Sequence, residues 1–514
     1  QRLESGSSVW LSFGIACAPL AALSGHLSGP SLGGHRSLRS MTTVVDAATL
    51  AALDVQIAQR RQRLETMIED YDESLDTIWM LLATMLVFFM HSGFSLLEAG
   101  TVRFKNTQNI LAKNLVVVTV GFLTWYLVGY SLAFGVLKDT NKFAGFTNFA
   151  MDGFWADKKK FRFWLFQGAC CATGGTIVSG AMAERAQLKG FGTYTVLLTS
   201  VIYPIVVYWV WSGKGFLNYP DDAGKMVSVF GPPFQDFAGS AVVHLVGGTG
   251  ALLGAIVVGP RKDRWNEAFA DVFQGHSIPF CVLGTFFLWF GWYGFNPGST
   301  LEMHTKEAAF RAALVAVNTT LAPCCSGMVV FFLRAKVFAP KSLDVGGFCN
   351  GILAGLVAVT AACSTVKPWE ACIIGLIAGL LYQVASMLVL KMKVDDVVDA
   401  FAVHGVNGFW AVLACGLFGN PDEGIGGNGA FYGGDQFGTQ LGGSVLIILW
   451  TAVLSLLIFL PLKRLGALRM SDAFQDHGAD FMEHSPAKAY NTPLSCSPTS
   501  KGVRASSQTF GMSA

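Results

Sequence analysis

The stretch FAGSAVVHLVGGTGALLGAIVVG, residues 237–259, decides how the rest of the chain is interpreted. A helix of about 23 apolar residues is long enough to cross a lipid bilayer. Its middle nevertheless carries a histidine, His244. An ionisable side chain at that depth is costly unless it faces protein or a cavity. We therefore expect His244 to point into the interior of a helix bundle.

A second apolar stretch repeats this arrangement. AVVHLVGG at 241–248 is matched by FAVHGVNG at 401–408, so that His404 follows His244 by 160 residues. Glycines flank each histidine and let neighbouring helices approach closely. They are Gly247 and Gly248 in the first stretch, and Gly405 and Gly408 in the second. Two hydrogen-bonded core histidines would give the same pattern, but its repetition favours a functional pair.

The composition indicates an integral membrane protein. The chain has 514 residues, of which 52% are hydrophobic and 14% are charged. Soluble domains carry about 25% charged residues. A net charge of +2 gives no reason to expect a nucleic-acid partner. The eleven cysteines lie mostly in apolar segments without metal-like spacing, so they are interpreted as packing residues, and no cofactor or metal site is expected.

The first 76 residues are expected to lie outside the membrane domain. Residues 1–40 contain no Met, and they are either an untranslated leader before Met41 or a truncated signal-like segment. Within 41–76, apolar residues recur every seven positions among Arg and Glu from Ala48 to Met67, which predicts an amphipathic helix on the outer side. This helix could pack on the body of the protein or on its copies, or form a solvated arm.

The predicted fold class is an all-α polytopic membrane protein with eleven transmembrane helices. The membrane domain spans 77–462 and consists of two five-helix halves, about 77–259 and 277–418, followed by an eleventh helix at 438–462; a tail, 463–514, follows. The helices are expected at about 77–99, 114–136, 162–183, 190–211, 237–259, 277–297, 308–333, 344–363, 368–390, 399–418 and 438–462.

Loop charges predict the orientation of the chain. One alternate set of loops carries about 15 Lys and Arg residues and the other about 11, six of them in the long loop 138–162. Long loops count less in the positive-inside rule, so the N-terminus is expected outside and the tail in the cytoplasm. Each histidine falls in the fifth helix of its half. Because an odd number of spans inverts the second half, the two histidines should meet near the midplane of an inverted repeat.

Several motifs resemble the ammonium transporter family, Amt/Mep with the Rh proteins as relatives, over about residues 93–490. The motifs are GFSLLEAGTVRFKN at 93–106, SGAMAER at 179–185, DFAGSAVVHLVGG at 236–248, GWYGFNPGS at 291–299 and DDVVDAFAVHGVNG at 395–408. The resemblance implies eleven helices around one pore per subunit and a homotrimer in the cell membrane that takes up ammonium as a nitrogen source, with methylammonium as an analogue.

The resemblance also assigns roles to residues of this sequence. His244 and His404 match the family's twin pore histidines. Trp211 and Ser299 match the aromatic and hydroxyl lining of the outer ammonium-recruitment site. Asp236 matches the aspartate that orders this site without being its main ligand. Alone, Trp211 would be interpreted as an anchor at the membrane interface.

The gate and the inner acidic residues are assigned by the same resemblance. Phe295 matches one of two stacked rings that close the pore. The third helix departs from the family pattern, because FQGAC supplies Phe166 and then Cys170 where a second aromatic residue is usual. Either the gate lacks one ring, or Phe166 or another Phe covers the gap. Asp395 and Asp399 match acidic positions before the tenth helix that pack the cytoplasmic loops.

The tail carries a further family element, GADFMEH at 478–484, with its tyrosine one residue late at Tyr490. In the family this element docks on the neighbouring subunit and gates its pore. Residues 491–514 are rich in Ser and Thr and are expected to be disordered. They could be a phosphorylated regulatory segment, acted on by a kinase or bound by a regulatory protein, or a passive polar tail.

The chemistry of these residues predicts transport of ammonia. An indole face attracts a small cation by roughly 0.5–2 kcal/mol, whereas a bare ion in a dry conduit costs on the order of 20 kcal/mol as an upper bound. Ammonium should therefore lose its proton near the gate and cross mainly as ammonia, with or without separate proton transfer through the imidazoles. The alternatives are an ammonium sensor that signals through its tail and a membrane enzyme that uses the histidines as metal ligands.

Overall fold

The computed structural model describes residues 46–137, 141–338, 341–422 and 424–490. The expected leader, 1–40, and the Ser/Thr-rich segment after 490 lie outside these residues. The chain divides into two units, one ending at Glu65 and the other beginning at Thr66. In the first unit the described residues form the start of α1 (Ala47–Thr101). Leu50, Ile57 and Leu64 are all at least half exposed there, as an amphipathic helix without a covered face would be.

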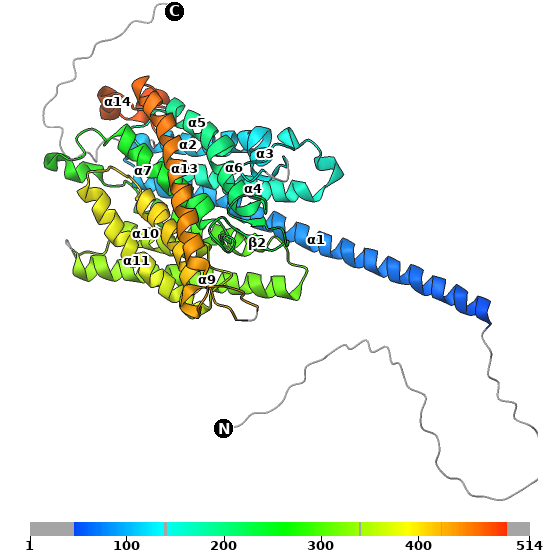
Figure 1. Ribbon diagram of the computed structural model, residues 1–514. Helices are drawn as coiled ribbons and strands as arrows, with labels where there is room; N and C mark the ends of the chain where they lie inside the picture. Colours follow the sequence, from blue (N-terminus) through cyan, green and yellow to red (C-terminus); the bar gives the residue numbers. More distant parts are fainter. Residues whose placement is uncertain (1–45, 138–140, 339–340, 423, 491–514) are drawn as a thin grey trace, which may run out of the picture. The chain divides into compact units, whose positions relative to one another are not determined.

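The second unit is a bundle of helices (Figure 1). In its first half, α1 is followed by η1 (Phe104–Asn106), α2 (Thr107–Thr124), η2 (Trp125–Gly129), α3 (Tyr130–Phe134), η3 (Phe149–Met151), η4 (Phe154–Ala156), α4 (Lys159–Ala181), α5 (Leu188–Leu197), η5 (Leu198–Ile202), α6 (Tyr203–Trp211), η6 (Ser240–Leu245) and α7 (Val246–Val258). A short antiparallel hairpin of β1 (Tyr219–Pro220) and β2 (Met226–Val227) pairs Tyr219 with Val227 before η6.

The part of this unit that follows α7 is also helical. It contains η7 (Glu267–Phe273), α8 (Ile278–Phe295), η8 (Pro297–Thr300), α9 (Lys306–Phe332), η9 (Leu333–Val337), α10 (Val345–Thr360), α11 (Pro368–Lys391), η10 (Phe401–Val406), α12 (Asn407–Phe418), η11 (Ala430–Tyr432) and α13 (Gln436–Arg464). The tail adds α14 (Asp472–His477) and α15 (Ala479–Glu483). The two halves meet where η6 contacts α12 and where η10 contacts α7.

Each of the predicted helical ranges overlaps a helical segment, and α1 covers both the amphipathic range and the first membrane range without a break. Among the described residues, nine helices are long and apolar enough to cross a membrane. Helix α10 is an apolar helix of only 16 residues, and α4 is not among the nine. Every residue of α4 from Phe166 to Ala181 is buried, so the surrounding protein allows it to be less apolar than a lipid-facing helix.

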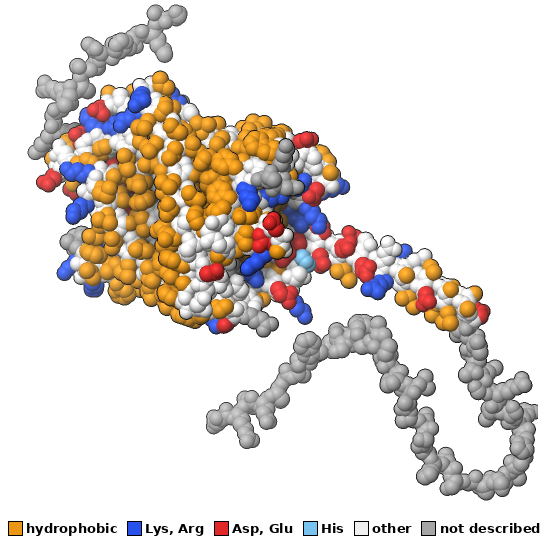
Figure 2. Space-filling model, viewed as in Figure 1, with side chains coloured by type: hydrophobic (Ala, Val, Ile, Leu, Met, Phe, Trp, Pro, Cys, Tyr) orange, Lys and Arg blue, Asp and Glu red, His pale blue; other side chains and the backbone are white. Residues whose placement is uncertain are grey.

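The surface of the second unit agrees with a membrane environment. On the face drawn in Figure 2, hydrophobic side chains form a band over α13 and its neighbours, and charged side chains gather toward the ends of the helices. The exposed apolar residues of α13 recur at one-turn spacing, as in Leu441, Val445, Leu449 and Val453. Such a stripe is costly in water and favourable against lipid.

Candidate functional site: a buried histidine pair

The two histidines predicted to meet lie in contact at the centre of the bundle. The Nδ1 atoms of His244 and His404 are 3.1 Å apart, which is hydrogen-bond distance. Their rings are nearly parallel, with centroids 5.1 Å apart and planes at 13°. His244 is fully buried and His404 is 5% exposed. Because two neutral imidazoles can each offer one donor and one acceptor, one Nδ1–H donates to the other Nδ1.

Both histidines lie in π-helical turns, His244 in η6 and His404 in η10, at the start of the helices that follow. Single π-helical turns inside helices occur often at functional sites because they rotate side chains away from the regular helical register. The wider turn is present at the same place in both halves. The repeated sequence therefore folds into a repeated local structure.

An aspartate stands eight residues before each histidine. The carboxylate of Asp236 accepts hydrogen bonds from the backbone N–H groups of four residues at the start of η6, at 2.7 to 3.1 Å; they are Gly239, Ser240, Ala241 and Val242. In the second half, Asp396 accepts from the backbone N–H of Phe401 at 2.8 Å. An acceptor at this place satisfies N–H groups that have no partner inside the helix.

Asp396 was not predicted from the sequence, whereas its neighbours Asp395 and Asp399 were assigned a packing role. Aligning the two repeats on their histidines would have identified it, because it occupies the position of Asp236. Burial, with Asp399 beside it, raises the pKa of Asp396 to about 6.

Aromatic rings surround the histidine pair. Trp292 stacks on His244 with ring centroids 5.2 Å apart and planes at 12°. Its Nε1–H donates to Thr360 Oγ1 at 3.0 Å, which fixes the orientation of the indole. Phe295 contacts His244 at 5.6 Å between centroids, and Phe94 contacts His404 at 6.1 Å. Trp292 and Phe94 were not predicted, although both lie inside the quoted motifs.

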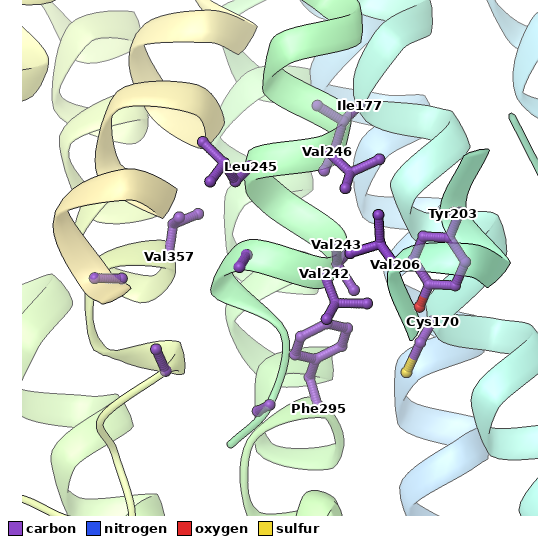
Figure 3. Packing of buried hydrophobic residues seen from close by; sticks show 14 of the residues in the cluster. Cys170, Ile177, Tyr203, Val206, Val242, Val243, Leu245, Val246, Phe295 and Val357 are labelled. Atoms are coloured by element: carbon purple, nitrogen blue, oxygen red, sulfur yellow. The ribbon is translucent and has the colours of Figure 1, made fainter. Parts of the chain in front are cut away.

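The candidate gate residues belong to one cluster of buried hydrophobic side chains, and Figure 3 shows two of them, Phe295 and Cys170. Phe295 lies close to Val242, and Cys170 lies beside Tyr203. Phe166 is buried near Gly298, whose Cβ position would be 3.4 Å from the Phe166 ring. Among the described residues, Phe166 makes no aromatic pair with Phe295, so a stack of two phenyl rings is not formed by these two side chains.

The candidate recruitment residues lie at the end of the bundle that carries Asp236. Trp211 is partly buried, and its Nε1–H donates to the backbone carbonyl of Asp236 at 2.7 Å. Ser299 donates to the carbonyl of Phe295 at 2.8 Å, which leaves its oxygen lone pairs available as acceptors. Asp236 thus connects the start of η6 to Trp211. Its backbone carbonyl accepts from the indole, and its carboxylate oxygens accept from backbone N–H groups at the start of η6.

The opposite end holds a network of buried charges. Asp395 accepts three hydrogen bonds from Arg261, one from its backbone N–H and two from its guanidinium, at 2.8 to 2.9 Å. Arg261 also donates to Glu184 at 2.8 Å. Although burial opposes ionisation, Arg261 and Arg185 hold the pKa of Asp395 well below its usual range. Asp399 instead accepts from Tyr382 and Ser386 on α11, at 2.8 and 2.9 Å.

The tail element packs against this end of its own chain. The carboxylate of Asp480 accepts from the backbone N–H groups of Gln108 and Asn109 at 3.0 Å. Tyr490 lies 3.2 Å from His276 through its hydroxyl group and stacks on Phe104. The GADFMEH motif therefore anchors the tail at the start of α2.

Comparison with known proteins agrees with this architecture. Residues 78–490 match the model of the Ammonium Transporter Family. The chain is 37% identical to ammonium transporter Amt2 of Archaeoglobus fulgidus over 437 residues, which cover 83% of this chain and 90% of the relative. It is 38% identical to ammonium transporter 3 of Dictyostelium discoideum over 421 residues, covering 80% of this chain and 93% of the relative.

Solved structures share the fold. A structure described as a sensor Amt protein superposes with a TM-score of 0.71 at 32% identity, covering 81% of this chain and 99% of that one. Mep2 of Saccharomyces cerevisiae superposes with a TM-score of 0.67 at 28% identity, covering 78% and 88%. The two relatives compared by sequence are both named as ammonium transporters, which are transport proteins rather than enzymes. From the length of the match and the identity to these relatives, the chain belongs to the ammonium transporter family.

Proposed function

We propose that this protein recruits ammonium at an outer site, removes its proton, and conducts ammonia through a pore lined by His244 and His404. The observation that carries this proposal is the 3.1 Å contact between the two imidazoles, buried in the bundle and bounded by aromatic rings. Trp211 and Ser299 would hold ammonium outside, through the indole face and a hydroxyl acceptor. Asp236 would hold the start of η6 in place without touching the cation.

The pore is suited to a small neutral base. His244 Nε2 is buried without a hydrogen-bond partner among the described residues. Ammonia could therefore form a hydrogen bond with this atom. Phe295 would close the path above the histidines. The thiol of Cys170 would take the place of the second ring, and because it is smaller than a phenyl group it favours a wider constriction than two phenyl rings would form.

We further propose that eleven helices cross the plasma membrane as an inverted five-plus-five repeat plus one, with the N-terminus outside and the tail in the cytoplasm. The position of both histidines in π-helical turns of the fifth and tenth helical segments supports the repeat. A homotrimer surrounded by lipid would follow the family. The tail, bound at the start of α2, would be the point at which a regulatory protein or kinase acts.

Uptake of labelled methylammonium by cells that lack their own ammonium transporters tests the proposal. The wild-type chain should support uptake, and His244→Ala and Trp211→Leu should each reduce it by roughly tenfold or more, since one pore group or one cation–π contact is lost. His477→Ala and Trp155→Leu are matched controls on exposed side chains and should leave uptake unchanged. Unchanged uptake in both site variants would reject the assigned site.

A second candidate is an ammonium sensor that binds without conducting. One structural relative is described as a sensor Amt protein, which keeps this possibility open. The same assay separates the two functions: a sensor would bind methylammonium in the purified protein but would not support uptake. The contact between the two histidines, with an apolar-lined cavity beside His404, favours the transporter.

A further inference from the structure

A cavity adjoins His404 on the side of the bundle that carries the tail. Its lining is apolar except for Glu98, Asn350 and His404; the other residues are Phe94, Leu97, Ile177, Leu353, Val398, Ala400 and Val403. Glu98 lies near the end of α1. Lys105, in the segment that follows, donates to the carbonyls of Gln475 and Asp476 in the tail, so this end of α1 is the one next to the tail. Glu98 and His404 are therefore the two ionisable side chains that share this cavity.

The carboxyl group of Glu98 is held at the cavity wall by neutral partners. Ser179 Oγ lies 2.6 and 2.7 Å from its two oxygens, and Asn114 Nδ2 donates to Oε2 at 2.7 Å. The side chain is only 2% exposed. Gly180 leaves room for it, because a Cβ at that position would lie 3.0 Å from Glu98 Oε1. The carboxyl is thus positioned by polar groups from α2 and α4.

Glu98 differs from Glu184 and Asp395, two other buried acidic residues of this end. Glu184 and Asp395 are paired with arginines. In the described part of the chain, Glu98 forms no ion pair with Lys, Arg or His. Lys113, next to Asn114 in sequence, is also fully buried, and its Nζ has no hydrogen-bond partner among the described residues. Burying an acidic side chain inside a membrane protein is costly when no basic side chain is paired with it, and such a residue is typically functional.

We propose that Glu98 is the proton-transfer group at the inner end of the pore, where ammonia regains the proton that it lost outside. This inference rests on the proposed function and selects the version in which the proton is carried separately. The O–H bond of the Glu98 carboxylic acid breaks as the fourth N–H bond of ammonium forms. The resulting carboxylate then takes a proton from the His404 imidazolium, which had received it through His244.

The geometry supports each part of this relay. His404 uses Nδ1 for its contact with His244, and its Nε2 makes no hydrogen bond to another described residue, so this atom is free to pass a proton into the cavity. A water molecule or the ammonia itself can connect two groups that face one cavity. Ser179 and Asn114 keep the carboxyl group at the wall in either protonation state, since the hydroxyl of Ser179 can donate or accept.

The test compares charge movement with substrate uptake. The full chain is reconstituted in proteoliposomes, and the current after a methylammonium pulse and the uptake of labelled methylammonium are measured for wild type and Glu98→Gln. Glutamine keeps the size and the hydrogen bonds of the side chain but cannot carry the proton. We expect the charge moved per methylammonium to fall by roughly tenfold or more while neutral methylamine still passes. Glu370→Gln is the matched control, because Glu370 is equally buried but is absent from the cavity lining.

The outcomes are distinguishable. An unchanged ratio of charge to uptake in Glu98→Gln would give Glu98 a structural role only and overturn the inference. A wild-type protein that takes up methylammonium without current would overturn it as well, yet would leave the proposed function intact. A folded wild type that takes up nothing would reject the proposed function itself. If Glu98→Gln is not recovered as folded protein, Glu98→Asp replaces it: the shorter carboxyl should lower the ratio, and an unchanged ratio would again overturn the inference.

Discussion

The Cβ position of Gly248 lies 2.2 Å from the backbone nitrogen of Gly405, so no side chain larger than hydrogen fits there. Gly408 makes the reciprocal approach, with its Cβ position 2.8 Å from the carbonyl oxygen of Ser240. Each of these two glycines stands four residues after a histidine. The two halves of the protein therefore cross at backbone contact distance, and this crossing sets the spacing between His244 and His404.

Gly248→Ala should separate the two halves and disturb the proposed pore. A Cβ at this site must push backbone rather than a flexible side chain, and overpacking of this kind typically costs about 1–3 kcal/mol. We expect a lower midpoint of thermal unfolding in detergent and a loss of methylammonium uptake. Gly438→Ala on α13 is the control, because nothing lies within 4 Å of its Cβ position. Equal effects of the two substitutions would contradict the role assigned to the crossing.

Asp395→Asn should destabilise the charged end in a pH-dependent way. The substitution leaves Arg261 with one buried carboxylate instead of two, and breaking a buried ion pair typically costs about 3–5 kcal/mol. The arginines lower the pKa of Asp395. The contribution of Asp395 to the free energy of unfolding is therefore complete above the ordinary aspartate pKa of about 4 and is lost as the pH falls below that value.

Thermal unfolding of both proteins across a pH series checks this expectation. The difference in unfolding midpoint between wild type and Asp395→Asn should be constant from neutral pH down to about pH 5 and should shrink in more acidic buffers. A difference that grows with acidity would mean that the carboxyl group is not ionised in the folded protein.

His304 should stabilise the loop between η8 and α9 most strongly in acidic buffers. It lies between η8 and α9, and its Nδ1 is 2.9 Å from a carboxylate oxygen of Asp76. The hydrogen bond with Asp76, helped by the charges of Asp76, Asp72 and Glu302, raises the pKa of His304. The contribution of His304 to the free energy of unfolding is therefore complete below the ordinary histidine pKa of about 6.5. It is lost as the pH rises through the raised pKa of His304.

His304→Gln tests this pH dependence. The unfolding midpoint of the variant should lie furthest below that of wild type at and below about pH 6.5, and the gap should close in alkaline buffer. His477→Gln is the control, because the ring Nδ1 of that histidine bonds to the backbone carbonyl of Ala473 in its own helix rather than to a carboxylate. A gap for His304→Gln that is independent of pH would show that the imidazole is not charged in the contact.

The sequence was sufficient to predict the histidine pair because a polar residue in an apolar helix has few stable positions. His244 could not face lipid, and the repeat around His404 identified its partner. The helical ranges followed from the same contrast between apolar and polar segments. Helix α4 was also predicted from its pattern, although its buried residues include Gly, Thr and Gln, which an apolarity criterion alone would miss.

The other parts of the site depend on contacts between distant segments. From the sequence, Trp292 is indistinguishable from the other aromatic residues of an apolar helix. Its role becomes visible only from its stacking on His244. Glu98 in SLLEAG could have faced solvent, since it stands near a helix end; only the packing of α2 and α4 buries it. Residue type and spacing restrict which groups can act, whereas three-dimensional packing determines which of them share a cavity.

Trp292 and Thr360 should act as one unit that supports the pore. Trp292→Phe keeps a ring beside His244 but removes the donor, and Thr360→Val removes the acceptor of the same 3.0 Å hydrogen bond. Each single substitution should cost about 1 kcal/mol or somewhat more, because a buried polar partner is left alone. The double variant should cost less than the sum, with a coupling of about 0.5–1.5 kcal/mol in a double-mutant cycle of unfolding free energies. Trp410→Phe paired with Thr360→Val provides the control, since Trp410 donates instead to the carbonyl of Ile374. Additive effects of Trp292→Phe and Thr360→Val would mean that the indole is held by packing alone.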